Sequence, residues 1–199
     1  TSVTTGSSLG GVDAFMVKFS NSGQAVWKQT GGGTGDDMGF YVKPDNAGGL
    51  FASGVFGCCG VVSGTFGSFT ITNASGWGGW IAKVDTGTGS YTWVIGQPGD
   101  LRVNGGLQVD ENNYLYQTGA FATTKTIKSF SSTGNTISLT SNGALDVYIA
   151  KYTPAGELLW AKSFGSTSDD YGNRSFYRKG KLYVHSMIGG NVSITQGST

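Results

Sequence analysis

Two pairs of adjacent aspartates are the residues of this sequence that most resemble a cation-binding arrangement. Asp36 and Asp37, and likewise Asp169 and Asp170, lie in stretches of glycine, serine and threonine, where ligands of hard cations such as calcium often occur. Calcium takes about six to eight oxygen ligands, and neither stretch has the Asp-x-Asp-x-Asp spacing that would supply them. Aspartates in such stretches also form turns by accepting hydrogen bonds from nearby backbone. We therefore favour a turn-forming role, predict no metal or cofactor, and keep calcium as the weaker alternative.

The only two cysteines, Cys58 and Cys59, are adjacent in the sequence GCCG. Neighbouring cysteines can close a strained vicinal disulfide, whose flat and rigid surface could pack against a sugar or another ring. They could equally stay reduced, or act as small buried apolar residues. An oxidising exterior would favour the disulfide, which is the form we expect. Two thiols and one distant histidine are too few ligands for a zinc site.

Two single residues could also take part in binding or catalysis. Trp77, in the glycine-rich GWGGW, could stack on a sugar ring or on a partner's side chain, or lie tucked against the surface. His185 is the only histidine, and no serine, cysteine or carboxylate motif surrounds it in LYVHSM. The sequence also lacks a Gly-x-Ser-x-Gly motif, a phosphate-binding loop and a glutamate pair suited to glycoside hydrolysis. We therefore predict that the chain is not an enzyme.

The composition predicts the elements that must position these residues. The 199 residues include 35 glycines and only 13% charged residues, while β-branched and aromatic residues are plentiful. This favours strands joined by tight turns, so we expect an all-β chain. The net charge is +1 and no basic stripe is present, which argues against nucleic acid and anionic membranes as partners. No apolar segment is long enough for a membrane-spanning helix, so membrane insertion is not expected.

A segment with two apolar runs around a small turn occurs three times. The copies are DAFMVKFSNSGQAVW at 13–27, GWIAKVDTGTGSYTW at 79–93 and DVYIAKYTPAGELLW at 146–160. Their shared lysines are 65 and 68 residues apart, and each copy ends on a tryptophan. The lysines are Lys18, Lys83 and Lys151, and the tryptophans are Trp27, Trp93 and Trp160. A long fixed period is typical of a repeat architecture, and we expect the tryptophans to occupy equivalent buried positions.

Each period holds about four short strands, which is the content of one β-propeller blade. We therefore predict a propeller-like array of about three four-stranded antiparallel blades. The expected units are an outer strand of a preceding blade at 1–10, then blades at 11–76, 77–143 and 144–199, the last of them short. Propellers have about four to eight blades. The array is therefore expected either to belong to a larger propeller, or to join other copies edge to edge through the 1–10 strand.

The motif DAFMVKF…G…W…GGGTGDD, followed by a D-x-x-G-x-L-F-A-S-G strand pair, resembles the SBBP-type β-propeller repeats of secreted and surface-anchored bacterial proteins. The resemblance covers essentially the whole chain and is weakest in the second copy, which lacks the double aspartate. VDTGTGSYTW, at 84–93, is also similar to the tryptophan motif by which quinoprotein propeller blades dock, a motif that does not itself imply a quinone.

The resemblance implies an extracellular or cell-surface location in a bacterium, and its members share no single activity. We expect a non-catalytic, adhesin-like structural or binding module. Its expected partners are a glycan or a protein at a cell surface. The alternative is a fragment of a propeller enzyme whose catalytic residues lie elsewhere.

Overall fold

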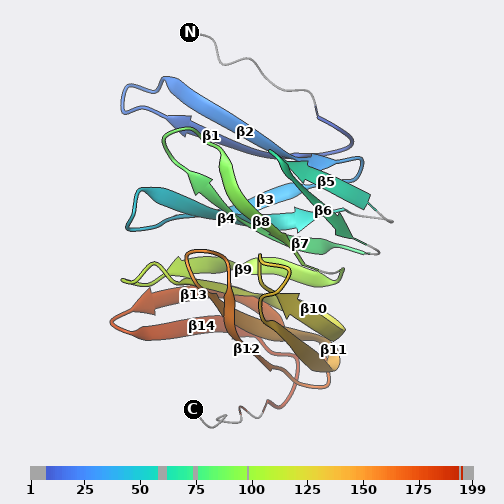
Figure 1. Ribbon diagram of the computed structural model, residues 1–199. Coiled ribbons are helices and arrows are strands. Elements are labelled where there is room, and N and C mark those ends of the chain that lie inside the picture. The colour runs from blue at the N-terminus through green and yellow to red at the C-terminus, as the bar shows by residue number, and fades with distance from the viewer. Residues whose placement is uncertain (1–7, 58–61, 74–75, 98, 193, 195–199) are drawn as a thin grey trace.

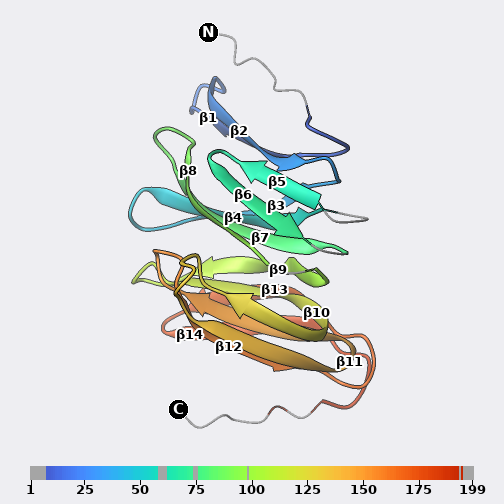
Figure 2. The same ribbon diagram turned by 45° about the vertical axis from the view of Figure 1, so that its right-hand side comes forward.

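The computed structural model describes residues 8–57, 62–73, 76–97, 99–192 and 194. These residues form fourteen β-strands and no helix, which confirms the prediction of an all-β chain. Accordingly, the described part of the chain has no helix long and apolar enough to cross a membrane. The strands make three four-stranded antiparallel sheets and one two-stranded sheet, stacked along the molecule (Figures 1 and 2).

The sheets are named here in chain order. The N-terminal sheet has the order β1 (Ala14–Phe19), β2 (Ala25–Gly33), β5 (Val62–Phe66) and β6 (Phe69–Asn73). The second sheet has the order β3 (Met38–Pro44), β4 (Gly49–Phe56), β7 (Gly78–Asp85) and β8 (Tyr91–Gly96). The third sheet has the order β9 (Leu101–Val109), β10 (Leu115–Lys128), β11 (Thr136–Tyr152) and β12 (Leu158–Phe164). The C-terminal sheet pairs β13 (Tyr171–Arg178) with β14 (Lys181–Met187).

The sheets are out of phase with the expected repeat units. Strands β3 and β4 fall in the unit 11–76, but they pair with β7 and β8 across the boundary at 76/77. In the same way β11 crosses the boundary at 143/144 and pairs on both sides of it. A period determines the spacing of equivalent residues. It does not determine which four strands pair to form one sheet, and so the expected blade boundaries do not coincide with the sheets.

The shared lysines and tryptophans lie in one common register. The cross-strand pairs are Lys18 with Trp27, Lys83 with Trp93, and Lys151 with Trp160, each directly before a shift in the ladder. The tryptophans therefore hold equivalent positions in their sheets. Only Trp93 is buried, whereas Trp27 and Trp160 are half-buried. The expectation of equal burial is wrong for these two, because they lie toward the two ends of the stack.

Two of the tryptophans connect their sheet to the next one. The Trp27 indole donates from Nε1 to the Thr86 carbonyl at 2.8 Å, in the turn between β7 and β8. The Trp93 indole donates to the Pro154 carbonyl at 3.1 Å, in the turn between β11 and β12. Each ring lies on the glycine of that turn, and a Cβ at Gly89 would come within 2.7 Å of Trp27. Glycine is needed there for the close approach and for a φ of +79°.

Two apolar clusters fill the spaces between the sheets. One joins the N-terminal and second sheets and contains Phe56, Phe66 and Trp80. The other joins the second and third sheets, and its largest fully buried side chains include Phe121 and Tyr148. Burying rings of this size supplies most of the favourable energy of such a stack, because apolar area is removed from water on both faces of each inner sheet.

Partly buried lysines support the hairpin turns of the two inner sheets. Lys83 forms an ion pair with the almost fully buried Asp45, and its ammonium lies 4.0 Å from the Phe51 ring centre. Lys151 repeats the arrangement with Asp110 at 3.4 Å. Burial by itself raises the pKa of Asp45. The bonds from Lys83 and from turn N–H groups outweigh it and bring the pKa below its ordinary 3.8.

Candidate functional site

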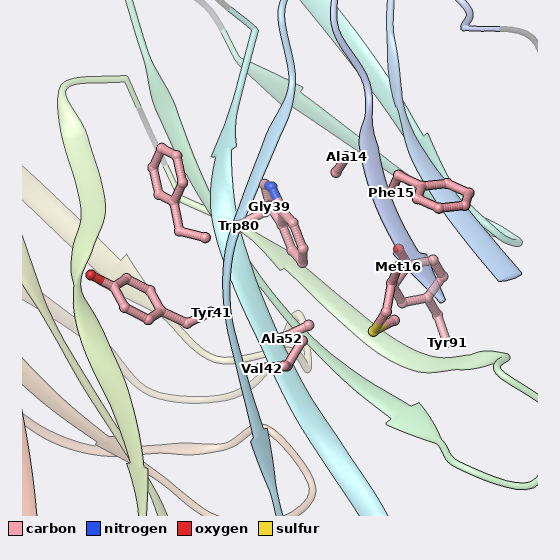
Figure 3. A pocket seen from close by; sticks show the side chains of 10 residues that line it. Ala14, Phe15, Met16, Gly39, Tyr41, Val42, Ala52, Trp80 and Tyr91 are labelled. Atoms are coloured by element: carbon pink, nitrogen blue, oxygen red, sulfur yellow. The ribbon is translucent and has the colours of Figure 1, made fainter. Parts of the chain in front are cut away.

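The strongest candidate site is an apolar groove between β1 of the N-terminal sheet and strands β3 and β4 of the second sheet, which we call the β1 groove (Figure 3). It encloses about 130 Å³. Its floor is made by the buried Ala52, Trp80 and Tyr91. Met16 lies beside Tyr91 on the β1 side, and Trp80 lies between β1 and β3.

The floor of the groove is rigid because Trp80 is fixed on several sides. Its Nε1 donates to the Met38 carbonyl at 3.2 Å, and its ring lies 4.9 Å from that of Phe66. A Cβ at Gly54 would come within 1.8 Å of the same carbonyl and 2.8 Å of Nε1. Glycine at this position therefore permits the indole to reach the backbone of β3, and holds the ring in place.

The walls of the groove are unusual because they leave large apolar side chains in water. Phe15 on β1, and Phe40 and Val42 on β3, are exposed although they line the groove. Contiguous exposed apolar surface of this kind marks an interaction site more often than isolated exposed residues do. Burial raises the pKa of the lining Tyr91, so its hydroxyl stays protonated at neutral pH. The groove therefore offers ring and methyl contacts for binding.

Trp77 lies next to the β1 groove. It is half-buried and lines a second hollow of about 260 Å³ together with Phe40 and Arg102. Its carbonyl accepts a hydrogen bond from the Asp100 backbone N–H at 2.7 Å, which fixes this segment to the start of β9. The prediction that Trp77 stacks on a ligand stays a prediction, and the ring now has a defined neighbourhood in which to test it.

The first aspartate pair holds the corner between the N-terminal and second sheets. The Asp37 carboxylate accepts the backbone N–H of Gly33 at 2.7 Å and of Gly57 at 3.0 Å. Its neighbour Asp36 accepts the N–H of Val12 at 3.1 Å. Both side chains therefore act on the backbone around them, as expected for turn-forming aspartates.

The second pair repeats the arrangement where the third sheet meets the C-terminal sheet. Asp170 is fully buried and accepts hydrogen bonds from the backbone N–H of Ser166, and of Gly189 at 2.7 Å. Asp169 is exposed and lies 3.5 Å from the Tyr171 hydroxyl. The two residues of the pair thus differ, since Asp170 accepts backbone N–H groups whereas Asp169 accepts the hydroxyl of a side chain.

Sequence reasoning missed one further aspartate at each corner. Asp13 lies beside Asp37 and Asp146 beside Asp170, and in each added residue Oδ1 is buried and accepts no hydrogen bond from a described residue. Burial, with added repulsion from Asp13 and Asp36, raises the pKa of Asp37 above 3.8. Burial and Asp170 do the same for the pKa of Asp146. The signal was available, because Asp13 and Asp146 begin two of the repeated segments.

The described residues contain no group of three or more histidine, cysteine or acidic side chains placed to hold a metal ion. His185 lies exposed on β14, apart from the aspartate corners and from the β1 groove. Cys58 and Cys59 lie outside the described residues, as does most of the 1–10 segment, so the predictions made for them stay predictions. Among the described candidates, the β1 groove alone combines a rigid floor with exposed apolar walls.

No protein-family model matches the chain, and no curated protein matches it at a significant level.

Proposed function

We propose that this chain is a non-catalytic structural and binding module of a bacterial secreted or cell-surface protein, built on a propeller-like array of blades. Its adhesin-like function is to bind protein, and the binding surface is the β1 groove. The carrying observation is that Phe15, Phe40 and Val42 stay exposed around a rigid floor of Trp80 and Tyr91.

The arrangement of the sheets supports the propeller-like part of the proposal. Four-stranded antiparallel sheets packed in sequence are the makeup of propeller blades. Trp27 and Trp93 each reach the turn of the following sheet, as the tryptophan docking motif implies. The extracellular setting rests on the resemblance to SBBP-type repeats in the residues quoted above.

The chemistry of the groove favours a protein segment over a glycan. A strand lying along β1 would satisfy the backbone groups of this edge while its alternate side chains fill the apolar hollow, which is strand addition. The walls carry no charged or amide side chain that could order the hydroxyls of a sugar. A glycan would need such polar partners in addition to a ring to stack on.

The test is a panel of extended peptides with alternating apolar residues, printed beside a glycan array and probed with the folded chain. We expect the affinity for the peptides to fall at least tenfold in Phe40→Ser, and we expect no binding to the glycans. Leu159→Ser is the matched control, because Leu159 is an apolar residue as exposed as Phe40 and lies outside the groove. Glycan binding that is unchanged in Phe40→Ser, or no peptide binding by the chain in its monomeric form, would refute the assignment.

A further inference from the structure

The two ends of the chain carry complementary halves of the sheet that occurs complete in the middle. In the second sheet, β3 and β4 form an inner pair and β7 and β8 an outer pair, joined by the β4–β7 ladder. The lysine–tryptophan register identifies β1 and β2 as an outer pair. The register shift identifies β13 and β14 as an inner pair, because it falls at the same place as in β3 and β4. In the described residues, the outer pair at one end has no inner pair, and the inner pair at the other has no outer pair.

The two strands that would join these halves are both at sheet edges. β1 is at the edge of the N-terminal sheet, and β14 is the second strand of a two-stranded sheet. Their counterparts are joined in both inner sheets, by the β4–β7 ladder and by the β10–β11 ladder. An edge strand of this length is a template for another strand. Within one molecule the two edges lie at opposite ends of the stack (Figure 1), so they do not meet.

Side-chain exposure indicates that, within the described residues, no strand covers β1 as its counterparts are covered. Phe15 is 55% exposed, whereas the residues at the same position of β7 and β11, Trp80 and Tyr148, are 3% and 0% exposed. Phe19 is likewise exposed, and its counterparts Val84 and Tyr152 are fully buried. An apolar residue at this repeat position is therefore buried where an inner pair adjoins its strand, and exposed to solvent on β1, which has no such neighbour in the described residues.

β14 shows the same contrast at the other end. Tyr183 is 57% exposed, whereas its counterparts Phe51 and Tyr116 on β4 and β10 are 0% and 7% exposed. Met187 is exposed as well, while Val55 at the same position of β4 is buried. The apolar residues of β14 match a neighbouring strand that the described chain does not supply.

The tryptophan contacts give an independent observation of the same kind. Trp27 covers the turn glycine Gly89 and Trp93 covers Gly156, each in the outer pair of the following sheet. Gly23, in the turn of the first outer pair, has the same backbone conformation, with a φ of +78°, and no atom within 4 Å of where its Cβ would be. Trp160 is the one of the three tryptophans with no such turn to cover.

We infer that β14 of one copy of this chain pairs with β1 of a second copy, and that the β13–β14 hairpin lies in the second copy's β1 groove. The inference rests on the proposed function, since it names the protein segment that the groove binds. The β4–β7 register sets the contacts, because Phe51 lies opposite Lys83. Tyr183 therefore lies opposite Lys18 of the second copy, and Trp160 covers its Gly23.

The geometry also sets the expected size of the assembly. Each copy has two sheets with both an inner and an outer pair, together with the outer pair β1–β2 and the inner pair β13–β14. These amount to about three blades, and propellers have about four to eight. Two copies give six, within that range, and a two-fold axis lets each β14 pair with the other copy's β1. We therefore expect a dimer of about 41 kDa, twice the 20.6 kDa of one chain.

One local feature differs from the inner sheets and offers a sensitive test. The turns before β4 and β10 carry Asp45 and Asp110, which pair with the sheet lysines. The turn before β14 has only bases, Arg178, Lys179 and Lys181, so Lys18 of the second copy meets positive charge there. Lysine to aspartate at this turn should therefore tighten the dimer.

The experiment measures the mass of the 199-residue chain by light scattering and sedimentation over a concentration series. We expect a dimer that Tyr183→Asp and Phe15→Asp each weaken at least tenfold, with unchanged circular dichroism. Leu159→Asp is the control, because Leu159 is also exposed but lies on β12, which is neither of the two strands proposed to pair. The dimer should withstand it.

A second set of variants tests the register of the pairing. Trp160→Ala should weaken the dimer, and because the half-buried ring also lies 6.0 Å from that of Tyr116 in its own copy, the stability of the monomer is measured separately by denaturant unfolding. Lys179→Asp should tighten the dimer more than Lys179→Asn does, although both place a better residue at a position with a φ of +49°, because only aspartate adds an attractive charge. Equal effects of the two Lys179 variants would contradict the predicted register.

The outcomes separate this inference from the proposed function. A chain that stays monomeric at every concentration and still binds strand peptides overturns only the pairing of copies. A monomer that binds no peptide overturns both. A dimer that survives both Tyr183→Asp and Phe15→Asp is formed by another surface, and also overturns the pairing.

Discussion

The hairpin β5–β6 and the outer half of the β10–β11 hairpin occupy the same place in the chain, yet they are held in different ways. Both lie between the second and third strands of an inner sheet. β5 and β6 leave that sheet and join β2 of the N-terminal sheet. In the third sheet the chain stays in one ladder, which continues from 124–128 to 136–140 past a register shift.

The first hairpin attaches to its neighbour through backbone, and glycine makes this contact feasible. Gly31, Gly32 and Gly33 at the end of β2 pair with β5, and Gly31 lies opposite Phe66. A Cβ at Gly31 would come within 2.1 Å of the Phe66 ring, and one at Gly33 within 2.0 Å of the Ser63 carbonyl. Any side chain at these positions would therefore separate the two strands.

The second hairpin reaches its neighbour through a side chain at the matching position. Gln97 follows Trp93 by four residues, as Gly31 follows Trp27. Its Oε1 accepts the Lys128 backbone N–H at 3.4 Å. Its Nε2 donates to the Lys128 carbonyl at 3.5 Å and to the Tyr152 hydroxyl at 3.0 Å. An amide side chain thus takes the place of a peptide group. Glycine therefore lets the hairpin pair directly with the neighbouring backbone, whereas glutamine bridges a larger separation between the equivalent elements with its side chain.

The largest expected effect is the loss of the ring that anchors the first hairpin. Phe66 is fully buried, 4.9 Å from the Trp80 ring and 5.7 Å from the Tyr91 ring. Phe66→Ala should lower the free energy of unfolding by about 3–5 kcal/mol, as measured by denaturant titration. Leu159→Ala, at an exposed position outside the proposed pairing strands, is the control and should change it by less than about 0.5 kcal/mol. Equal losses would show that the hairpin is not anchored by this ring.

The next effect concerns the backbone approach at Gly31. Gly31→Ala places a methyl group against the Phe66 ring and should cost about 2–3 kcal/mol, as overpacking does. In a Phe66→Leu background the same substitution should cost less, because the contacting ring is gone. Additive losses in the double variant would mean that Gly31 and Phe66 are not coupled.

A smaller effect is expected for the amide that holds the second hairpin. Gln97→Ala leaves the buried Tyr152 hydroxyl without its donor and should cost about 1–2 kcal/mol. Adding Tyr152→Phe should recover part of the loss, since both polar partners are then removed. If the free energy of unfolding lost in the double variant equals or exceeds the sum of the losses in the two single variants, the carboxamide does not act through Tyr152.

The smallest effect is expected at the exposed face of the second hairpin. The Thr126 hydroxyl bonds to that of Ser138 at 3.1 Å, and Thr124 to Thr140 at 2.9 Å. Thr126→Ala should cost only a few tenths of a kcal/mol, because water replaces the bond. A loss above about 1 kcal/mol would indicate that this face is covered in solution.

Much of the local structure could be predicted from the sequence. The strand content follows from composition, and the lysines and tryptophans that define the repeats do lie in one register. The aspartate pairs were expected to serve turns, and Asp37 and Asp170 do accept backbone N–H groups. These features depend on residues near each other in the chain, where pattern and turn chemistry carry the information.

The grouping of strands into sheets and the β1 groove could not be predicted. A strand such as β4 has apolar residues on both faces, and this pattern is the same whether its partner precedes or follows it in the chain. The groove depends on Phe15 and Phe40 staying exposed, and Phe15 occupies the same repeat position as the buried Trp80 and Tyr148. Burial at an end depends on which neighbour is absent, and a repeat sequence does not encode that.

The contacts that Trp27 and Trp93 make with the following sheet have a consequence for how the sheets would separate under a pulling force. Tension applied between the two ends of the stack passes through the sheet-to-sheet contacts in series, as in other arrays held by nearest neighbours. The weakest contact then yields first. The half-buried Trp27 holds Thr86 and Gly89, whereas the buried Trp93 holds Pro154 and Gly156. The N-terminal sheet should therefore detach first under a pulling force, while the second and third sheets remain in contact with each other.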